Sequence, residues 1–320
     1  MGKLISAIFL LNAIFVIALA LTEEEEYQML VQQMATEGAD VPQDVVETAS
    51  LAAAEHPTEE VTYGYDEDSQ YPPYLWSEKW PTCKGLRQSP INLTPATCKL
   101  DYSRHPLKLN RFYTVPTTTT ITNLGHTVQF SFTFGKYGPT VTRGILNKKT
   151  YLFAQAHFHF GRTDDIGSEH TIDSKSASLE QHLVFYKAEY GDVMTASEHS
   201  DGLIVVATLF QATDNVANKI YTENLGQVLQ PGDSFTLNGA KGYSLLNFIE
   251  TQNVKHIRYS GSLTTPPCSE SVTWYISTSV RPISHADLAA FRALFGEHGE
   301  PMAGDTRPTQ LTNGRVCYMR

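Results

Sequence analysis

The pattern of apolar and polar residues changes at about residue 62, and beyond that point it predicts a chain built mainly of β-strands. Short runs rich in β-branched and aromatic residues are separated by glycine, proline and asparagine-glycine turn signals. The predicted strands are Thr117–Thr122, Thr127–Phe134, Gln155–Phe160, His182–Tyr186, Leu203–Gln211 and Val272–Ser277. Helical periodicity is sparse, and the predicted helices are Asn215–Asn224, Tyr243–Phe248 and Ser284–Leu294, the last with Ser284 as N-cap. We therefore expect 62–320 to form a single strand-dominated domain with a few peripheral helices.

Residues 1–20 have the pattern of a signal peptide. An apolar run over 4–21 follows a single basic residue, Lys3, and contains the small-x-small cleavage pattern Ala18-Leu19-Ala20. An uncleaved signal anchor is the alternative, because the run is close to the length of about 20 residues that spans a bilayer. Both interpretations place the rest of the chain outside the cytosol. We expect a protein that is secreted into an extracellular or periplasm-like space, with no membrane span in the mature chain.

Charge separates a second N-terminal segment from the domain. Residues 22–61 hold eleven of the 34 acidic residues and no lysine or arginine, and Lys3 is the only one of the 24 basic residues before residue 62. The remainder therefore carries 23 residues of each sign and is neutral. We expect 21–61 to be a partly disordered acidic leader or pro-segment, and a docking arm stays open as a further interpretation. Nucleic acid is an unsuitable partner, because phosphate binding needs clustered lysine and arginine.

Cysteines and one sequon fit an exported chain. Four cysteines predict two disulfides, for which three pairings exist. Asn92-Leu93-Thr94 is the only N-x-S/T sequon with a permissive middle residue, so Asn92 is a candidate glycosylation site.

Three histidines on two predicted strands form the sharpest candidate site. Side chains alternate along a strand, so His157 and His159 share one face and can point at one ion. A pair of ordinary hydrogen-bonded histidines would explain this motif equally well, but His182 adds a third imidazole. Three histidines without a thiolate favour zinc with a fourth position open to water, which is typical of a catalytic site. Gln155 and Glu180 each precede a histidine by two residues and can accept its second ring N–H, which fixes the tautomer.

The same residues belong to a set of motifs that resembles the α-class carbonic anhydrases of the secreted type. The motifs are Gln88-Ser89-Pro90-Ile91-Asn92-Leu93, Asn123-Leu124-Gly125-His126, Gln155-Ala156-His157-Phe158-His159-Phe160-Gly161, Gly167-Ser168-Glu169-His170-Thr171, Glu180-Gln181-His182-Leu183-Val184 and Tyr259-Ser260-Gly261-Ser262-Leu263-Thr264-Thr265-Pro266-Pro267. The resemblance extends from about Tyr65 to Arg315 and is specific, because six motifs occur in the order of the family. It implies a mainly β (α+β) domain around a large, mostly antiparallel twisted central sheet.

The resemblance also implies an activity, the zinc-dependent reversible hydration of CO2 to bicarbonate and a proton. The reaction would proceed by attack of zinc-bound hydroxide, with a histidine as proton shuttle. The implied zinc ligands are His157, His159 and His182, and Gln155 and Glu180 are their hydrogen-bond partners. The implied catalytic residues are His126 as the shuttle, Thr264 as the hydroxyl that orients the attacking oxygen, and Glu169 as its partner. The implied substrate-binding residues are Val184, Val205, Leu263, Thr264, Thr265 and Trp274.

Further implications concern disulfides, inhibitors and other side chains. The resemblance pairs Cys83 with Cys268, which leaves Cys98 and Cys317 for a second bridge or Cys317 for an intermolecular one. It implies binding of sulfonamide-type inhibitors, and it assigns Tyr65 as the active-site tyrosine of the family. His170 is expected to brace the active-site wall. The remaining histidines are interpreted as ordinary residues: His56, His105, His199, His256, His285 and His298.

Two other function classes compete with this one. A catalytically inactive, carbonic-anhydrase-like extracellular binding protein is the first alternative, but such relatives lose a ligand histidine and this chain retains all three. A different zinc or serine hydrolase is the second, and the chain contains neither H-E-x-x-H nor G-x-S-x-G. An active, zinc-dependent carbonic anhydrase is therefore the prediction, and its oligomeric state is left open.

Overall fold

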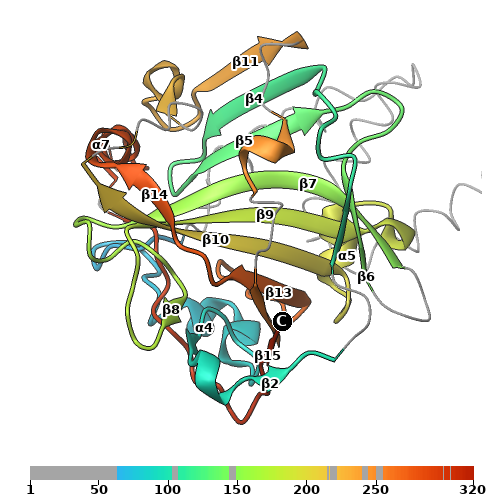
Figure 1. Ribbon diagram of the computed structural model, residues 1–320. Helices are drawn as coiled ribbons and strands as arrows, with labels where there is room; N and C mark the ends of the chain where they lie inside the picture. The colour runs from blue at the N-terminus through green and yellow to red at the C-terminus, as the bar shows by residue number, and fades with distance from the viewer. Residues whose placement is uncertain are drawn as a thin grey trace, which may run out of the picture. The chain divides into compact units, whose positions relative to one another are not determined.

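A large twisted sheet organises the computed structural model (Figure 1). The residues that the structure describes are 63–102, 107–143, 149–214, 216, 222–239, 244–249, 255–297, 299–302 and 304–320. They all lie within one compact unit, Thr62–Arg320. The predicted signal peptide and acidic segment lie outside the described residues, as do His56, His105 and His298, so the expectations about them stay predictions.

Thirteen strands of the described residues form the main sheet. They are β2 (Lys99–Leu100), β3 (Lys108–Asn110), β4 (Thr118–Asn123), β5 (Val128–Thr133), β6 (Thr140–Arg143), β7 (Lys149–Phe160), β9 (Leu179–Lys187), β10 (Leu203–Thr213), β11 (Ser234–Asn238), β12 (His256–Gly261), β13 (Val272–Ser277), β14 (Arg281–Ser284) and β15 (Tyr318–Met319). Their order is β11-β4-β5-β7-β9-β10-β13-β12-β15-β2, with β6 beside β7, β3 beside β6, and β14 beside β10. Most neighbours are antiparallel, as expected, whereas β10 pairs in parallel with β13 and β14 and β15 pairs in parallel with β2. A separate parallel pair joins β1 (Asn92–Leu93) to β8 (Thr171–Ile172).

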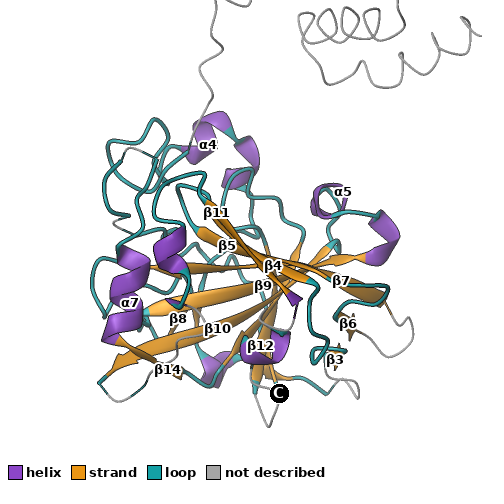
Figure 2. Cartoon of the chain, turned by 90° about the horizontal axis from the view of Figure 1, so that it is seen from above, coloured by secondary structure: helices purple, strands orange, loops and turns teal. Residues whose placement is uncertain are grey.

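Helices are short and lie around the edges of the strand layers (Figure 2). The α-helices are α4 (Trp76–Lys79), α5 (Val193–Ser197) and α7 (His285–Arg292), and the 3-10 turns are η1 (Pro81–Lys84), η2 (Pro95–Thr97), η3 (Ala188–Tyr190), η4 (Leu225–Gln227) and η6 (Leu245–Asn247). None of the helices in the described part of the chain is both long enough and apolar enough to cross a membrane.

The six predicted strands correspond to β4, β5, β7, β9, β10 and β13, although β7 begins six residues earlier than expected, at Lys149. The predicted C-terminal helix is α7, and its N-cap is confirmed, because the Ser284 hydroxyl accepts a hydrogen bond from the Asp287 N–H at 3.0 Å. The helix expected over Tyr243–Phe248 is wrong in type. Its described residues contain only the 3-10 turn η6, because a run this short has too few i→i−4 bonds to hold an α-helix. Most of Asn215–Asn224 lies outside the described residues.

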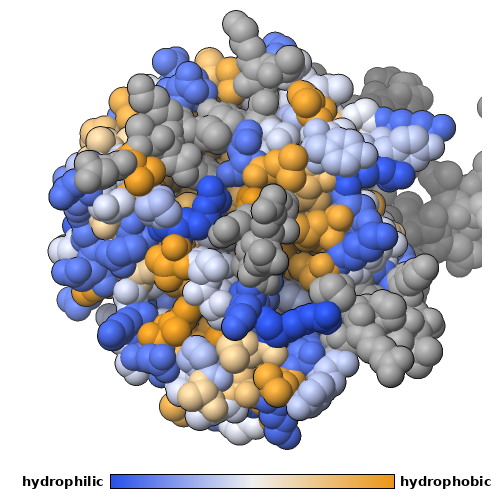
Figure 3. Space-filling view, viewed as in Figure 1, coloured by the Kyte–Doolittle hydropathy of each residue, from blue (hydrophilic) through white to orange (hydrophobic). Residues whose placement is uncertain are grey.

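Two apolar clusters occupy opposite faces of the sheet. Along β7 and β9, Phe158 and Leu183 face the larger cluster, whereas Val184 belongs to the smaller one together with Val205 and Trp274. Polar residues cover most of the visible surface, and apolar residues form separate small groups on it (Figure 3). The inward-facing histidines of the candidate site lie on the side of the smaller cluster.

Candidate active site and metal centre

Strand register brings the three predicted ligand histidines together. His157 on β7 lies directly opposite His182 on β9, and His159 lies opposite Glu180. Residues opposite each other in an antiparallel pair share a face, so all four side chains point to the same side of the sheet. The rings of His159 and His182 are 4.6 Å apart, and both residues are 1% exposed.

Each of the three imidazoles has one ring nitrogen engaged by an oxygen acceptor. The bonds are His157 Nδ1 to Gln155 Oε1 at 2.8 Å, His182 Nε2 to Glu180 Oε1 at 2.7 Å, and His159 Nδ1 to the main-chain oxygen of Asp305 at 2.7 Å. An oxygen acceptor requires the N–H on that nitrogen, which leaves the opposite nitrogen of each ring as a lone-pair donor. The bonds to Gln155 and Glu180 are those expected from the sequence.

The three remaining nitrogens fit a divalent metal ion. They are His157 Nε2, His159 Nε2 and His182 Nδ1, and atoms of this group lie within 4.8 Å of one another. His157 Nε2 and His182 Nδ1 are 3.1 Å apart, close to the separation of about 3.3 Å between nitrogens bound to one tetrahedral zinc at 2.0–2.1 Å. Two facing lone pairs repel unless a cation lies between them. His159 Nε2 is buried without a hydrogen-bond partner among the described residues, which also indicates a metal ligand.

Burial favours the neutral form of His157 and His182, as metal ligation requires. It holds the pKa of His157 well below its ordinary value, and the nearby imidazoles of His182 and His159 act in the same direction. Burial likewise lowers the pKa of His182 to about 4, although its hydrogen bond to Glu180 opposes this shift.

Glu180 joins the ligand histidine to the wall behind it. Its Oε1 accepts from both His182 Nε2 and His170 Nδ1 at 2.7 Å, and its Oε2 accepts from the His170 main-chain N–H at 2.7 Å. Burial alone would raise the pKa of Glu180, but His170 and His182 hold it well below its ordinary value. His170 Nε2 bonds to the Tyr259 hydroxyl at 2.6 Å, so both ring nitrogens of His170 are occupied and the residue braces the wall rather than facing the metal site.

Glu169 lies beside the histidine cluster and is hydrogen-bonded to Thr264. Burial raises the pKa of Glu169 to about 8 and the nearby charge of Glu180 adds to this, while hydrogen bonds from the Arg307 main-chain N–H and the Thr264 hydroxyl oppose it. Glu169 Oε2 is 3.4 Å from His159 Nε2. A Thr264 hydroxyl that donates to Glu169 presents its oxygen lone pairs as acceptors.

An apolar wall adjoins the cluster on β9, β10 and β13. Val184 lies opposite Val205, which in turn pairs with Trp274. The Trp274 ring is 4.8 Å from the ring of His182, and Leu263 packs against the same cluster. The predicted apolar substrate residues are therefore neighbours in the structure.

His126 lies in the turn between β4 and β5, where Gly125 adopts a φ of 80° that favours glycine. Its side chain is 24% exposed, with Nδ1 3.7 Å from Glu297 Oε1. The ring is 5.0 Å from the ring of Tyr63, and both residues line a pocket that also includes Glu297. His126 is thus a partly exposed side chain at this pocket.

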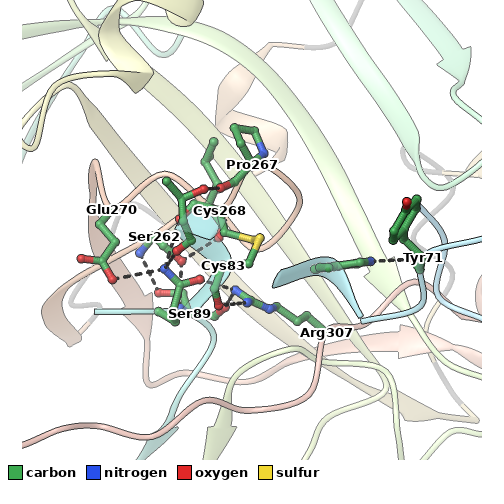
Figure 4. The surroundings of a disulfide bond; sticks show 12 residues. Tyr71, Cys83, Ser89, Ser262, Pro267, Cys268, Glu270 and Arg307 are labelled. Atoms are coloured by element: carbon green, nitrogen blue, oxygen red, sulfur yellow. Dashed lines mark hydrogen bonds between the residues drawn. A yellow bond between two sulfur atoms is a disulfide. The ribbon is translucent and has the colours of Figure 1, made fainter. Parts of the chain in front are cut away.

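The loop that carries Thr264 is fixed by a disulfide. Cys83 is bonded to Cys268, and the Cys268 N–H donates to the Thr265 main-chain oxygen at 2.8 Å (Figure 4). Arg307 ties the same region together, because its guanidinium donates to the main-chain oxygens of Cys83 at 3.2 Å and Ser89 at 2.8 Å. These contacts hold the N-terminal segment against the active-site loop.

The second bridge joins Cys98 to Cys317 near the sheet edge formed by β15 and β2. The alternative of an intermolecular bond through Cys317 does not apply in this structure. Asn92, the candidate glycosylation site, is on β1, where its Nδ2 donates to Ser174 Oγ at 3.2 Å, and its occupancy stays a prediction.

Sequence reasoning missed three residues of the site. Asp305 supplies the acceptor for His159 through its main chain, which no side-chain pattern reveals. Arg307 supports Glu169 through its main-chain N–H. Tyr63 hydrogen-bonds to Thr265, whereas the Tyr65 hydroxyl, which was expected to be the active-site tyrosine, is buried without a hydrogen-bond partner in the described residues.

Comparisons with known proteins agree with this geometry. A family model described as eukaryotic-type carbonic anhydrase matches residues 69–320. The chain is 36% identical over 261 residues to carbonic anhydrase 7 of Homo sapiens, covering 79% of this chain and 95% of that protein. It is 32% identical over 260 residues to carbonic anhydrase 6 of Mus musculus, covering 79% and 80%. It is 31% identical over 264 residues to carbonic anhydrase 15 of Mus musculus, covering 79% and 82%.

Proposed function

The chain belongs to the eukaryotic-type carbonic anhydrase family, and from that premise we propose that it is an active, zinc-dependent enzyme that reversibly hydrates CO2 to bicarbonate and a proton. One observation carries the proposal. His157, His159 and His182 each direct an unprotonated ring nitrogen to a common point, while their N–H groups are held by Gln155, Asp305 and Glu180. This arrangement supports a metal-dependent enzyme over a relative that has lost a ligand histidine.

Zinc held by the three histidines would supply a Lewis acid that lowers the pKa of water toward neutrality, which is the general chemistry of this family. The chain's own residues would do the rest. The hydroxyl proton of Thr264 is already donated to Glu169. The hydroxyl oxygen can therefore act toward any further partner only as a hydrogen-bond acceptor. It would therefore orient the hydrogen of the nucleophilic oxygen and leave a lone pair directed at carbon.

The apolar wall suits CO2, which has little capacity for hydrogen bonding. Val184, Val205, Leu263 and Trp274 would receive the substrate, and Thr265 would lie beside it. Excluding water from this wall keeps the electrostatic contacts of the site strong.

A proton must leave the site for solvent in each cycle. We assign this role to His126, because it lies at the exposed side of the site and a free imidazole exchanges protons near neutral pH. The ring of Tyr63 packs beside it.

The remaining proposals concern the setting of the enzyme. We infer export through the signal peptide at 1–20, binding of sulfonamide-type inhibitors at the metal site, and a catalytic domain over 62–320. The two disulfides are in keeping with an oxidising compartment.

Stopped-flow CO2 hydration by the purified chain tests the main proposal. We expect rapid hydration that is abolished by a zinc chelator and restored by added zinc. His182→Ala should lose the activity together with the metal, whereas His126→Ala should lower kcat roughly tenfold or more and leave kcat/KM nearly unchanged, with recovery in imidazole buffer.

His199→Ala is the matched control, because His199 stacks on Tyr190 at 3.9 Å and belongs to no part of the site. It should hydrate CO2 at the wild-type rate. A wild-type chain that binds one zinc and yet hydrates CO2 no faster than buffer would contradict the proposal and favour a binding-only protein.

A further inference from the structure

Asp305 contacts one short stretch of β7 through both its main chain and its side chain. Its main-chain oxygen accepts from His159 Nδ1 at 2.7 Å, and its main-chain N–H donates to the Phe160 oxygen at 3.1 Å. Its carboxyl Oδ1 accepts from the Phe160 N–H at 2.7 Å. Asp305 is fully buried. The carboxyl group is therefore fixed beside a histidine that we place on zinc.

The second carboxyl oxygen of Asp305 has no ordinary partner. Oδ2 is buried, has no hydrogen bond within the described residues, and lies 3.7 Å from His159 Nδ1. At the other edge of the same ring, Glu169 Oε2 is also unpartnered and lies 3.4 Å from Nε2. A buried oxygen without a donor is costly unless positive charge lies nearby.

The His159 imidazole gains positive character when its Nε2 binds a cation. A divalent ion withdraws electron density from the ring and makes the Nδ1–H edge more positive, which is the edge that faces Asp305. The other ligand histidines differ. His157 is held by the neutral amide of Gln155, and the carboxylate on His182 is shared with His170.

We propose that the Asp305 carboxyl is a positioning residue that strengthens zinc binding through His159, beyond the hydrogen bond made by its main chain. This inference rests on the proposed zinc site. It predicts that the side chain contributes to metal affinity although it does not touch the metal.

Asp305→Asn tests the proposal by replacing the ionisable carboxyl with a neutral amide while keeping an oxygen for the Phe160 N–H. Zinc affinity is measured on the metal-free chain by competition with a chromophoric chelator, together with the rise in Tm that zinc produces. We expect the zinc Kd to increase by about tenfold and the zinc-induced rise in Tm to shrink, with the Tm of the metal-free chain unchanged or higher, because a neutral amide costs less to bury than a carboxylate without a donor. A purely structural role would lower the Tm of the metal-free chain instead.

Asp287→Asn is the matched control, because Asp287 is a buried carboxyl on α7 whose oxygens accept hydrogen bonds from the hydroxyls of Ser284 and Thr222. Its zinc Kd should stay within twofold of wild type. If Asp305→Asn does not fold, Asp305→Ser, which keeps a short hydroxyl acceptor, takes its place. A zinc Kd within twofold of wild type in the Asp305 variant, or an equal change in both variants, would overturn the inference.

The same data separate this inference from the proposed function. A wild-type chain that binds zinc without hydrating CO2 would refute the function, while the ratio of zinc Kd values would still decide the role of Asp305. A wild-type chain that binds no zinc would overturn both.

Discussion

Strands β7 and β9 carry buried side chains on both faces, but the chemistry of the two faces is opposite. On the face toward the larger apolar cluster, Phe158 and Leu183 are at most 1% exposed, and they meet other hydrocarbon side chains. On the opposite face, His159 and His182 are equally buried but meet ring nitrogens and carboxyl oxygens. The same pair of strands therefore supports a packed core on one side and a polar site on the other.

The difference shows what a buried polar group requires. On the site face, oxygen acceptors occupy one nitrogen of each ligand imidazole, and the atoms left unpaired include His159 Nε2, Glu169 Oε2 and Asp305 Oδ2. All three lie around one ring, where a cation bound to that ring would compensate them. Unpaired atoms that converge on one point indicate a binding site.

Gln181 is the counterexample on the apolar face. It lies directly opposite Phe158 in the β7–β9 register and is fully buried. Neither oxygen nor nitrogen of its amide has a hydrogen-bond partner among the described residues. In the strand register it lies between Phe158 on β7 and Thr208 on β10, on the face away from the histidines, so its unpaired atoms should cost stability without serving the reaction.

Phe158→Ala should have the largest effect on stability, because it removes a large side chain from the packed apolar face. The ring is fully buried and packs against Phe130 and Phe291 with centroid distances of 5.5 and 5.1 Å. Its removal leaves a cavity, so we expect the free energy of unfolding to fall by about 3–5 kcal/mol in urea denaturation. Leu311→Ala, at a side chain that is 78% exposed, should change it by about 0.5 kcal/mol or less. A tenfold weaker zinc affinity in folded Phe158→Ala would contradict the independence of the two faces.

Glu180→Gln should have the next largest effect, a loss of zinc affinity, because it disturbs the hydrogen bonds of the polar face. The amide nitrogen of glutamine would meet the His170 N–H, a donor, where a carboxylate oxygen now accepts at 2.7 Å. The partner of His182 would be lost or turned, so zinc affinity should fall by about 10- to 100-fold in chelator competition. Glu270→Gln, at a partly exposed carboxylate paired with Arg87, should leave zinc affinity unchanged. Equal zinc Kd values for Glu180→Gln and wild type would show that this carboxylate does not support the metal site.

The sequence predicts a hydrogen-bond partner in this site when the two residues are neighbours on one strand, and it does not when they are far apart in the chain. The alternation in Gln155–Phe160 correctly separates the two faces, because side-chain direction in a strand has a period of two. It also places the acceptors of His157 and His182, since Gln155 and Glu180 precede them by two residues on the same face.

The acceptor of His159 could not be predicted in this way. It is the main-chain oxygen of Asp305, 146 residues further along the chain. Every residue type carries that oxygen, so only the path of the C-terminal loop determines it. Tyr63 and Arg307 reach the site by the same kind of long-range packing, and the resemblance to a family marked neither residue.

Gln181→Leu should have the smallest of the three effects, and its direction is opposite, because it should make the chain more stable. It tests whether an unpaired polar group on the apolar face costs stability. The substitution is close to equal in volume and removes two buried polar atoms that lack partners. We expect the free energy of unfolding to rise by about 1–3 kcal/mol and the Tm to rise with it, with CO2 hydration unchanged, because the side chain faces away from the histidines.

Gln211→Leu is the matched control for this change, because the Gln211 amide donates to the Ser178 hydroxyl at 3.0 Å. Removing a bonded amide should bring no gain in Tm. A loss of stability in Gln181→Leu as large as in the control would mean that the buried amide is paired, for example by a trapped water molecule. The apolar face would then hold a polar group that is as well hydrogen-bonded as the groups around the proposed metal site, and the two faces would differ only in the water that they retain.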